Sequence, residues 1–135
     1  MDYDFKLELK VRDYECDIQG IVNNGVYMNY LEHARHEFLL HKGVDFAELA
    51  KNKINLVVVR AELDYKYPLT SGDTFWVGLN LVPASRVRFD FIQDVYRSSD
   101  DKLVLKAKVT GTSVNERGRP YVPEEIKVLF SEVGE

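Results

Sequence analysis

The stretch that decides the fold runs from Asn24 to Lys42 and reads NGVYMNYLEHARHEFLLHK. Its apolar residues recur every three or four positions, which places them on one stripe of a helix. The members of the stripe are Tyr27, Tyr30, Leu31, Ala34 and Phe38. Asn23 or Asn24 suits the N-cap, because an asparagine side chain accepts from the free amides of the first turn. Gly43 suits the helix exit, and residues 44–52 are expected to add a short second helix.

On both sides of this helix the apolar period changes to two, which is the period of a strand with one buried face. Upstream, the alternation runs from Phe5 to Val11, and residues 13–24 follow as a loop. Downstream, four alternating stretches are separated by turns rich in Pro, Gly, Asp, Asn and Ser. These predicted strands cover residues 57–67, 75–81, 89–95 and 103–114. The tail over residues 120–130 is expected to pack on the body.

One strand, one long helix and then four strands in sequence predict the α+β class, with an antiparallel sheet and a helix on one face. A long antiparallel sheet wrapped around one central helix is the hotdog fold. The chain has 135 residues, which is within the usual size of one domain. It shows no repeat, linker or low-complexity segment, so residues 1–135 are expected to form a single hotdog domain.

The composition narrows the classes of function. The chain has 18 Lys and Arg against 22 Asp and Glu, and its net charge of -4 argues against a general nucleic-acid binder. Cys16 is the only cysteine, so an intrachain disulfide is excluded. Residues 1–15 lack the apolar core of a signal peptide, and no run of about 18 apolar residues could cross a bilayer. We expect a cytoplasmic protein without a membrane partner.

Asp17 is the first candidate for chemistry, because it lies in the loop that leads into the long helix. The free amides at a helix N-terminus carry roughly half a positive charge, and they can hold a carbonyl oxygen as it becomes negative. Such a donor contributes about 3–4 kcal/mol in acyl transfer. A carboxylate and an oxyanion hole would then lie within one short segment. The alternative is that Asp17 is only a loop or Asx-turn residue.

The segment around Asp17 resembles the motif of the 4-hydroxybenzoyl-CoA thioesterase family. That motif has an Asp, a Gly three residues later, an apolar pair, a Tyr and then an Ala-Arg pair. The corresponding residues here are Asp17, Gly20, Ile21, Val22, Tyr27, Ala34 and Arg35. The segments 65–69 and 72–73 resemble the family's second-strand exit and turn. The resemblance extends from the first strand to the tail near Pro123.

The resemblance implies a hotdog fold, a homodimer or homotetramer with sites at subunit interfaces, and hydrolysis of acyl-CoA thioesters without metal or organic cofactor. By position, Asp17 is the catalytic carboxylate that attacks the carbonyl or activates water. The backbone amides of Asn24 and Gly25 are the oxyanion donors. One branch of the family has a His where this chain has Asn24, so a side-chain acid-base role is in doubt there. Asn23 and Tyr27 either bind substrate, or Asn23 serves as the helix N-cap and Tyr27 as a core residue.

Other reactive side chains fit poorly. Cys16 lacks the His base that a catalytic cysteine needs within its loop. His36-Glu37 and His41 are one residue too far apart for the two helix ligands of a zinc protease. His33, Glu37 and His41 share one flank of the helix, which is more simply a solvated face. We expect no metal site.

A substrate with phosphates would need basic residues. Arg86, Arg88 and Lys66 are the candidates for binding the CoA phosphates, and the alternative is that they are solvated charges on the outer face of a strand. Neither a glycine-rich phosphate loop nor a G-x-S-x-G elbow occurs.

The sequence therefore predicts an acyl-CoA thioesterase. Within enzymes, the rival is an acyl-carrier-protein thioesterase of the same fold, which would need a basic surface patch for its acidic carrier. From another class, the rival is a non-catalytic acyl-CoA-binding hotdog module. A hotdog dehydratase would need a His near the helix start. Apolar residues on both faces at 57–59 and 75–77 predict at least a dimer, because such a face usually packs against another surface.

Overall fold

A computed structural model describes residues 2–131 of the chain. The predicted order of one strand, a long helix, a short helix and four long strands is confirmed. The elements are β1 (Phe5–Lys10), η1 (Asp13–Glu15), α1 (Asn24–His41), α2 (Phe46–Lys51), β2 (Asn55–Tyr65), β3 (Thr74–Pro83), β4 (Phe89–Arg97), β5 (Lys102–Val114), β6 (Pro120–Tyr121) and α3 (Glu124–Lys127).

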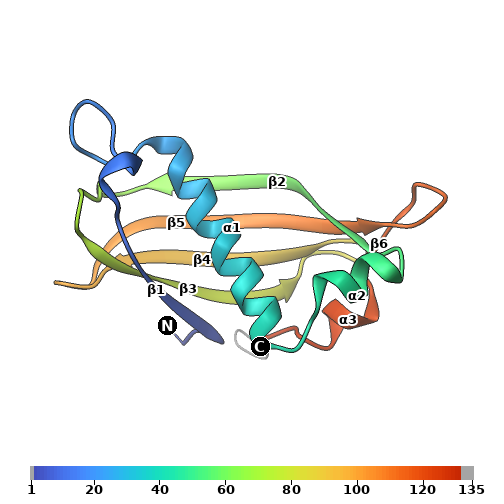
Figure 1. The fold of residues 1–135 in the computed structure, drawn as a ribbon. Coiled ribbons are helices and arrows are strands. Elements are labelled where there is room, and N and C mark those ends of the chain that lie inside the picture. Colours follow the sequence, from blue (N-terminus) through green and yellow to red (C-terminus); the bar gives the residue numbers. More distant parts are fainter. Residues whose placement is uncertain (1, 132–135) are drawn as a thin grey trace.

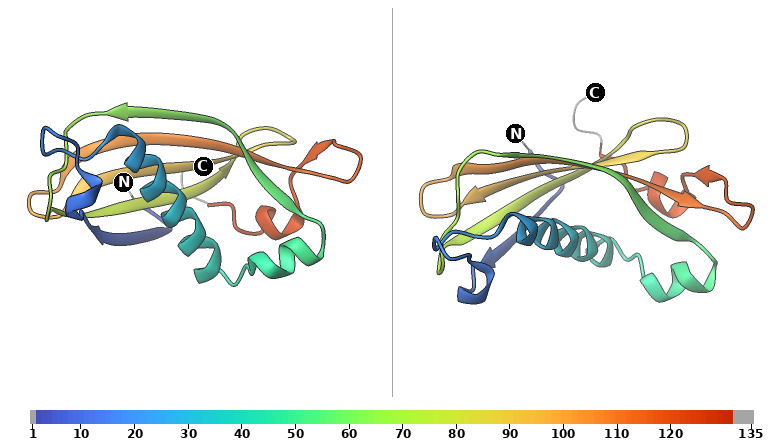
Figure 2. Two further views of the ribbon diagram at one scale, coloured as in Figure 1. Left: turned by 45° about the horizontal axis from the view of Figure 1, so that its top comes forward. Right: turned by 90° about the horizontal axis from the view of Figure 1, so that it is seen from above.

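The strands form one antiparallel sheet in the order β1-β3-β4-β5-β2, with β6 added beside β5. Helix α1 crosses one face of this sheet (Figures 1 and 2). We call the end where α1 begins and β2 ends the proximal end. The end where β3 joins β4, and β5 joins β6, is the distal end. The α+β class and the hotdog fold predicted from the sequence are confirmed.

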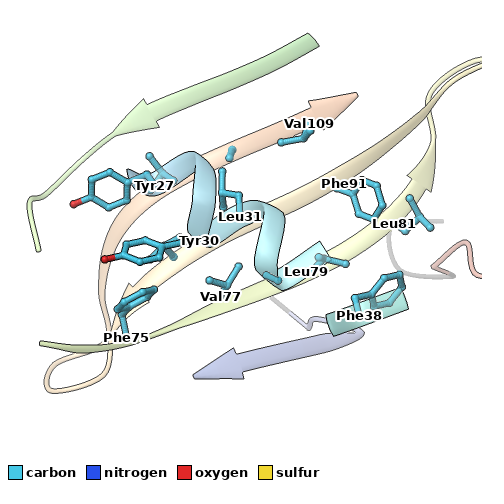
Figure 3. Packing of buried hydrophobic residues seen from close by; sticks show 14 of the residues in the cluster. Tyr27, Tyr30, Leu31, Phe38, Phe75, Val77, Leu79, Leu81, Phe91 and Val109 are labelled. Atoms are coloured by element: carbon cyan, nitrogen blue, oxygen red, sulfur yellow. The ribbon is translucent and has the colours of Figure 1, made fainter. Parts of the chain in front are cut away.

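The core lies between α1 and the inner face of the sheet. The predicted helix stripe is buried, and Leu31, Ala34 and Phe38 have no exposed surface. Figure 3 shows Leu31 and Phe38 of the helix together with core residues of β3, β4 and β5, among them Val77, Phe91 and Val109. Each fully buried Leu or Phe contributes about 1.5–3 kcal/mol relative to an exposed one. This contact fixes α1 on the sheet and thereby the position of the loop before it.

One charged side chain lies inside this interface. Arg35 is only 7% exposed, and its Nη1 donates to Oε1 of Gln93 at 3.2 Å. Nε2 of Gln93 in turn donates to the carbonyl of Leu31 at 2.9 Å. Burial lowers the pKa of the Arg35 guanidinium, and the nearby Glu32 carboxylate opposes this shift. The Arg35–Gln93 contact therefore ties α1 to β4 by a buried polar link.

The outer face of the sheet carries an N-terminal arm. The Tyr3 hydroxyl donates to Oδ2 of Asp94 at 2.6 Å, and the amide of Asp4 donates to Oδ1 of Asn80 at 2.8 Å. The Tyr3 ring lies over Gly78, where an added Cβ would come within 2.6 Å of the ring. The arm therefore buries Asp94 and Asn80, although both lie on the face away from α1.

The edge strand β2 is the least covered part of the sheet. Val57, Val58 and Val59 are 40%, 51% and 43% exposed. Residues 75–77, the other stretch expected to be apolar on both faces, are covered on both. Phe75 and Val77 are buried in the core, and the Trp76 ring stacks on the Tyr96 ring with the centroids 4.5 Å apart.

Within residues 2–131, no helix has both the length and the apolar character needed to cross a membrane.

Candidate active site

The loop before α1 is a small hairpin at the proximal end of the sheet (Figure 1). Cys16 and Val22 form an isolated antiparallel bridge, and the amide of Asp17 donates to the carbonyl of Ile21 at 2.8 Å. Ile21 also bridges Thr70, which follows β2. The hairpin is therefore held to the sheet on one side and continues directly into the helix on the other.

Asp17 begins the tight turn at the tip of this hairpin. Its Oδ1 accepts from the amide of Gln19 at 2.8 Å, and its carbonyl accepts from the amide of Gly20 at 2.9 Å. Gly20 has φ +81°, a conformation that favours glycine. Within residues 2–131 the second carboxylate oxygen accepts no hydrogen bond. The predicted Asx-turn is thus present, and it leaves one oxygen of a half-buried carboxylate available for chemistry.

The start of α1 has one free amide. Oδ1 of Asn23 accepts from the amide of Gly25 at 3.0 Å, so Asn23 is the N-cap, as one of the two sequence alternatives had it. The amide of Val26 donates to the Asn23 carbonyl at 2.9 Å. The amide of Asn24 makes no hydrogen bond within residues 2–131. Of the two predicted oxyanion donors, Gly25 is therefore engaged by the cap and Asn24 is available.

The predicted substrate residue Tyr27 lies in the core. It is 3% exposed, and its hydroxyl oxygen accepts from the amide of Leu69 at 3.1 Å. Burial raises the pKa of the Tyr27 hydroxyl above its ordinary value. This geometry agrees with the core alternative for Tyr27, because the side chain fixes the chain after β2 against the first turn of α1.

A groove of about 680 Å³ opens between the end of β1 and α1, next to the hairpin. Its lining includes Arg12, Glu15, Tyr30 and His33. The Tyr30 hydroxyl donates to Oε1 of Glu15 at 2.7 Å, and the same oxygen accepts from the amide of Arg12 at 2.8 Å. The groove offers space for part of a ligand at the same end of the sheet as Asp17.

The three basic candidates do not form one cluster. Arg86 and Arg88 lie in the β3–β4 turn at the distal end, whereas Lys66 directly follows β2 at the proximal end. The expectation that these arginines lie on a strand face is wrong, since the turn occupies residues 84–88. Alternating residues identify strands, but they do not reveal which ends of the strands meet.

The remaining reactive side chains are structural. Partial burial and the nearby carboxylates of Asp13 and Asp17 raise the pKa of the Cys16 thiol, which is the opposite of an activated cysteine. His36 packs against Phe46 and His41 against Phe5, with ring centroids 4.9 and 5.4 Å apart. Within residues 2–131 no three His, Cys, Asp or Glu side chains gather in a way that could hold a metal ion.

One residue at the site was not identified from the sequence as part of it. The Tyr65 hydroxyl at the end of β2 donates to the carbonyl of Asn24 at 3.2 Å. This bond orients the first peptide of α1 from the sheet side. Its only sequence signal was the position of Tyr65 in the strand-exit segment 65–69. The proximal end thus carries Asp17, with one carboxylate oxygen that accepts no hydrogen bond within residues 2–131, on the loop that leads into the Asn24 amide at the start of α1.

Comparisons with known proteins agree with the fold. Residues 11–130 match the family model of the thioesterase-like superfamily. The acyl-acyl carrier protein thioesterase ATL3, chloroplastic, of Arabidopsis thaliana is 36% identical over 126 residues, which are 93% of this chain and 66% of that protein. This chain thus spans slightly less than two thirds of the length of that plant relative.

Two further proteins are similar over most of their own length. The long-chain acyl-CoA thioesterase FadM of Escherichia coli is 33% identical over 103 residues, which are 76% of this chain and 77% of that protein. The crystal structure of a hypothetical protein from Aquifex aeolicus superposes with a TM-score of 0.85 at 34% identity. That match covers 94% of this chain and 99% of the other.

Proposed function

The chain belongs to the thioesterase-like superfamily, and from this premise we propose that it hydrolyses an acyl-CoA thioester to the free acid and CoA, with Asp17 as the catalytic carboxylate. The prediction of a thioester hydrolase is confirmed by the family match and by relatives that are named thioesterases. The observation that supports the finer proposal is the free oxygen of Asp17 on a loop that leads into the unpaired Asn24 amide. Within the superfamily, the motif from Asp17 to Arg35 favours the 4-hydroxybenzoyl-CoA thioesterase branch.

The chemistry assigns one role to each group. In one route the free oxygen of Asp17 attacks the carbonyl carbon, CoA leaves as thiolate, and water then hydrolyses the acyl anhydride. In the other route Asp17 takes a proton from water as the hydroxide adds, and that proton passes to the departing thiolate. In both routes negative charge develops on the carbonyl oxygen. The Asn24 amide would stabilise that charge without reorganisation, because its peptide group is already held by the hydrogen bond from the Val26 amide to the Asn23 carbonyl.

Two neighbouring residues keep Asp17 and the Asn24 amide in position. Asn23 caps the helix and keeps the Gly25 amide occupied. Tyr27 fixes the chain after β2 through Leu69. We assign both residues to positioning, with the acyl group entering from the side of the Asp17 hairpin.

We propose that the enzyme is a homodimer that pairs through the two β2 edges. Among residues 2–131, β2 pairs only with β5, so within this part of the chain its other edge has unpaired backbone groups, and Val57 to Val59 expose apolar surface there. An exposed apolar edge of this kind is a ready site for pairing with another strand. When a strand pairs with its own copy across a two-fold axis, the two strands run antiparallel.

The cytoplasmic location expected from the sequence stays a prediction.

A second candidate is hydrolysis of an acyl thioester on a carrier protein. Its support is the identity of 36% with a relative named as an acyl-acyl carrier protein thioesterase. CoA and carrier proteins both present the acyl group on a phosphopantetheine arm, so the chemistry at Asp17 would be unchanged. The two candidates differ in the group attached to the other end of that arm, which is a nucleotide in CoA and a protein in the carrier.

A panel of thioesters tests the proposal. We expect the purified protein to release free thiol from acyl-CoAs, and short, long and aromatic acyl groups would reveal the preferred acyl class. The same acyl group on a carrier protein provides the second arm of the panel. Absence of thiol release from every substrate in both arms would contradict the proposed function.

A further inference from the structure

Four arginines lie on two neighbouring turns at the distal end of the sheet. Arg86 and Arg88 belong to the β3–β4 turn, and Arg117 and Arg119 belong to the β5–β6 turn. All four residues are exposed, and within residues 2–131 none forms an ion pair with a carboxylate. Since acidic residues outnumber basic ones in the chain, this four-arginine surface is a local reversal of the overall charge.

A buried threonine brings the two turns together. Oγ1 of Thr112 donates to the carbonyl of Val87 at 2.6 Å and lies 3.4 Å from the carbonyl of Tyr121. Val87 separates Arg86 from Arg88, and Tyr121 follows Arg119 by two residues. Figure 2 shows both turns at the same end of the sheet, opposite the hairpin that holds Asp17. The two turns that carry the four arginines therefore lie next to each other.

The backbone under these arginines is ordered. Oδ1 of Asn115 accepts from the amides of Arg117 and Arg119 at 2.9 and 3.0 Å. In the other turn the amide of Ala84 donates to the carbonyl of Arg88 at 3.0 Å. Ordered turns lose little conformational entropy when a partner binds.

Nearby carboxylates are already engaged. Glu116 lies on the β5–β6 turn itself, and its Oε1 is 3.5 Å from Nζ of Lys53. Asp90, at the start of β4, accepts from Oγ1 of Thr110 at 2.5 Å. Lys53 offsets the charge of Glu116, and Asp90 offsets one arginine, so the surface keeps a net positive charge and is suited to an anionic partner.

The four-arginine surface is too far from Asp17 of its own chain to serve that site. Strand β4 runs from the distal to the proximal end over nine residues, which is about 26 Å at about 3.3 Å per residue. A phosphopantetheine arm is comparable to about five extended residues and spans about 18 Å. A carrier bound at the distal end could not place its thioester at the Asp17 of the same chain.

In the proposed dimer the four-arginine surface of one subunit lies closer to the catalytic site of the partner subunit. Asn55 lies beside Val114, immediately before the β5–β6 turn. Antiparallel pairing of the two β2 edges, if centred on Arg60 in the middle of the strand, would bring Asn55 beside Tyr65 of the partner subunit. In every subunit Tyr65 bonds to Asn24 at the site. From β5 across β2 to the partner's β2 there are two inter-strand spacings, or about 10 Å.

We propose that the four-arginine surface docks an acidic carrier protein and presents its acyl-phosphopantetheine arm to the catalytic site of the partner subunit. This inference rests on the second candidate of the proposed function, hydrolysis of an acyl thioester on a carrier protein, and it adds a docking surface for that carrier. The arginines lie exposed on turns, whereas small ligands bind in concave pockets, and the 680 Å³ groove at the proximal end contains none of them. Exposed charge on rigid turns suits electrostatic steering of a protein partner.

Calorimetric titration tests the docking without relying on catalysis. The probes are a holo-acyl carrier protein without an acyl group and, separately, free CoA. The variants are the pairs Arg86→Glu with Arg88→Glu and Arg117→Glu with Arg119→Glu. The control pair, Lys6→Glu with Lys42→Glu, makes the same charge change on two exposed residues, one on β1 and one at the end of α1, and neither lines the groove.

We expect each arginine pair to weaken carrier binding at least about tenfold, and wild-type affinity to fall with added salt. The control pair should bind the carrier like the wild type, and all proteins should bind CoA alike. Carrier binding that is absent in the wild type, or unchanged in both arginine variants, would overturn the proposal. An equal loss of CoA binding would also overturn it, because the surface would then recognise the nucleotide. Failure of the thioester panel with intact carrier binding would instead count against the proposed function alone.

Discussion

The side-chain Oδ1 of Asn23 accepts a hydrogen bond from the amide of Gly25 at 3.0 Å. The cap thereby occupies one of the two amides that could bind an oxyanion, and it leaves the Asn24 amide as the unpaired donor at the start of α1. Asn23 has φ -62° and ψ 138°, the extended conformation that residues before a proline adopt. This geometry makes it possible to delete the Asn24 N–H without disturbing the helix.

The substitution Asn24→Pro tests the oxyanion donor. Proline is favoured at the first position of a helix, and it has no N–H. We expect kcat/KM for thioester hydrolysis to fall by about 100- to 1,000-fold, as for the loss of one oxyanion donor. Steady-state kinetics provide the measurement, and circular dichroism confirms the fold.

Asn24→Ala is the matched control, since it removes the side chain and keeps the amide. Its kcat/KM should stay within about threefold of wild type, as for a surface substitution that changes no special contact. A large loss in the alanine variant with little loss in the proline variant would show that the Asn24 side chain, rather than the backbone, takes part.

A second prediction concerns the cap itself. Asn23→Ala removes the acceptor for the Gly25 amide, and we expect the free energy of unfolding to fall by about 1 kcal/mol. Asn23→Ser should restore most of this loss, because serine is also a strong N-cap. Urea unfolding measures both values. Equal stability of the alanine variant and wild type would mean that the cap contributes nothing to the fold.

Much of this architecture follows from the sequence. The helical stripe identified α1, and the alternation identified each strand within a few residues, because burial against one core imposes both periods. Asn23 was one of two candidates for the cap. The Asx-turn at Asp17 was foreseen as an alternative to catalysis, and the structure shows the turn with one carboxylate oxygen still free.

The rest depends on which strands are neighbours, and local patterns do not reveal this. Arg86 and Lys66 were grouped as one basic cluster, yet antiparallel pairing places them at opposite ends of the sheet. Tyr65 was a strand-exit residue whose contact with Asn24 arises only when β2 forms the edge beside the helix start. Tyr3 packs over Gly78, a contact between residues far apart in sequence that no periodicity signals.

The buried Arg35–Gln93 contact predicts a stability effect. Gln93→Leu leaves the Arg35 guanidinium buried without its acceptor, and a lost hydrogen bond to a charged group costs about 1.5–3 kcal/mol. We expect a loss in this range by urea unfolding. The double variant Arg35→Met with Gln93→Leu should recover part of it, since an apolar pair can replace a buried polar one. A double variant less stable than Gln93→Leu alone would contradict this account.

The proposed dimer predicts that a substitution on the β2 edge lowers the molecular mass of the protein in solution. Val58→Lys places a charge within the exposed apolar stretch of β2, which pairing of the two edges would have to bury. We expect wild type to be at least a dimer at micromolar concentration by light scattering, and the variant to be a monomer. Leu40→Lys is the control, because Leu40 is an exposed apolar residue on α1. A monomeric wild type would contradict the proposed assembly.

The most direct test of the account is the turnover number of Asp17→Asn on an acyl thioester that the wild type hydrolyses. The asparagine side chain keeps the oxygen that accepts from the Gln19 amide, so the turn is retained and only the charged, free oxygen is lost. We predict that kcat falls at least about 100-fold while the circular dichroism spectrum and the melting temperature stay unchanged. If Asp17 serves only as an Asx-turn residue, the variant keeps its activity. A kcat above about one tenth of the wild-type value would therefore contradict catalysis by Asp17.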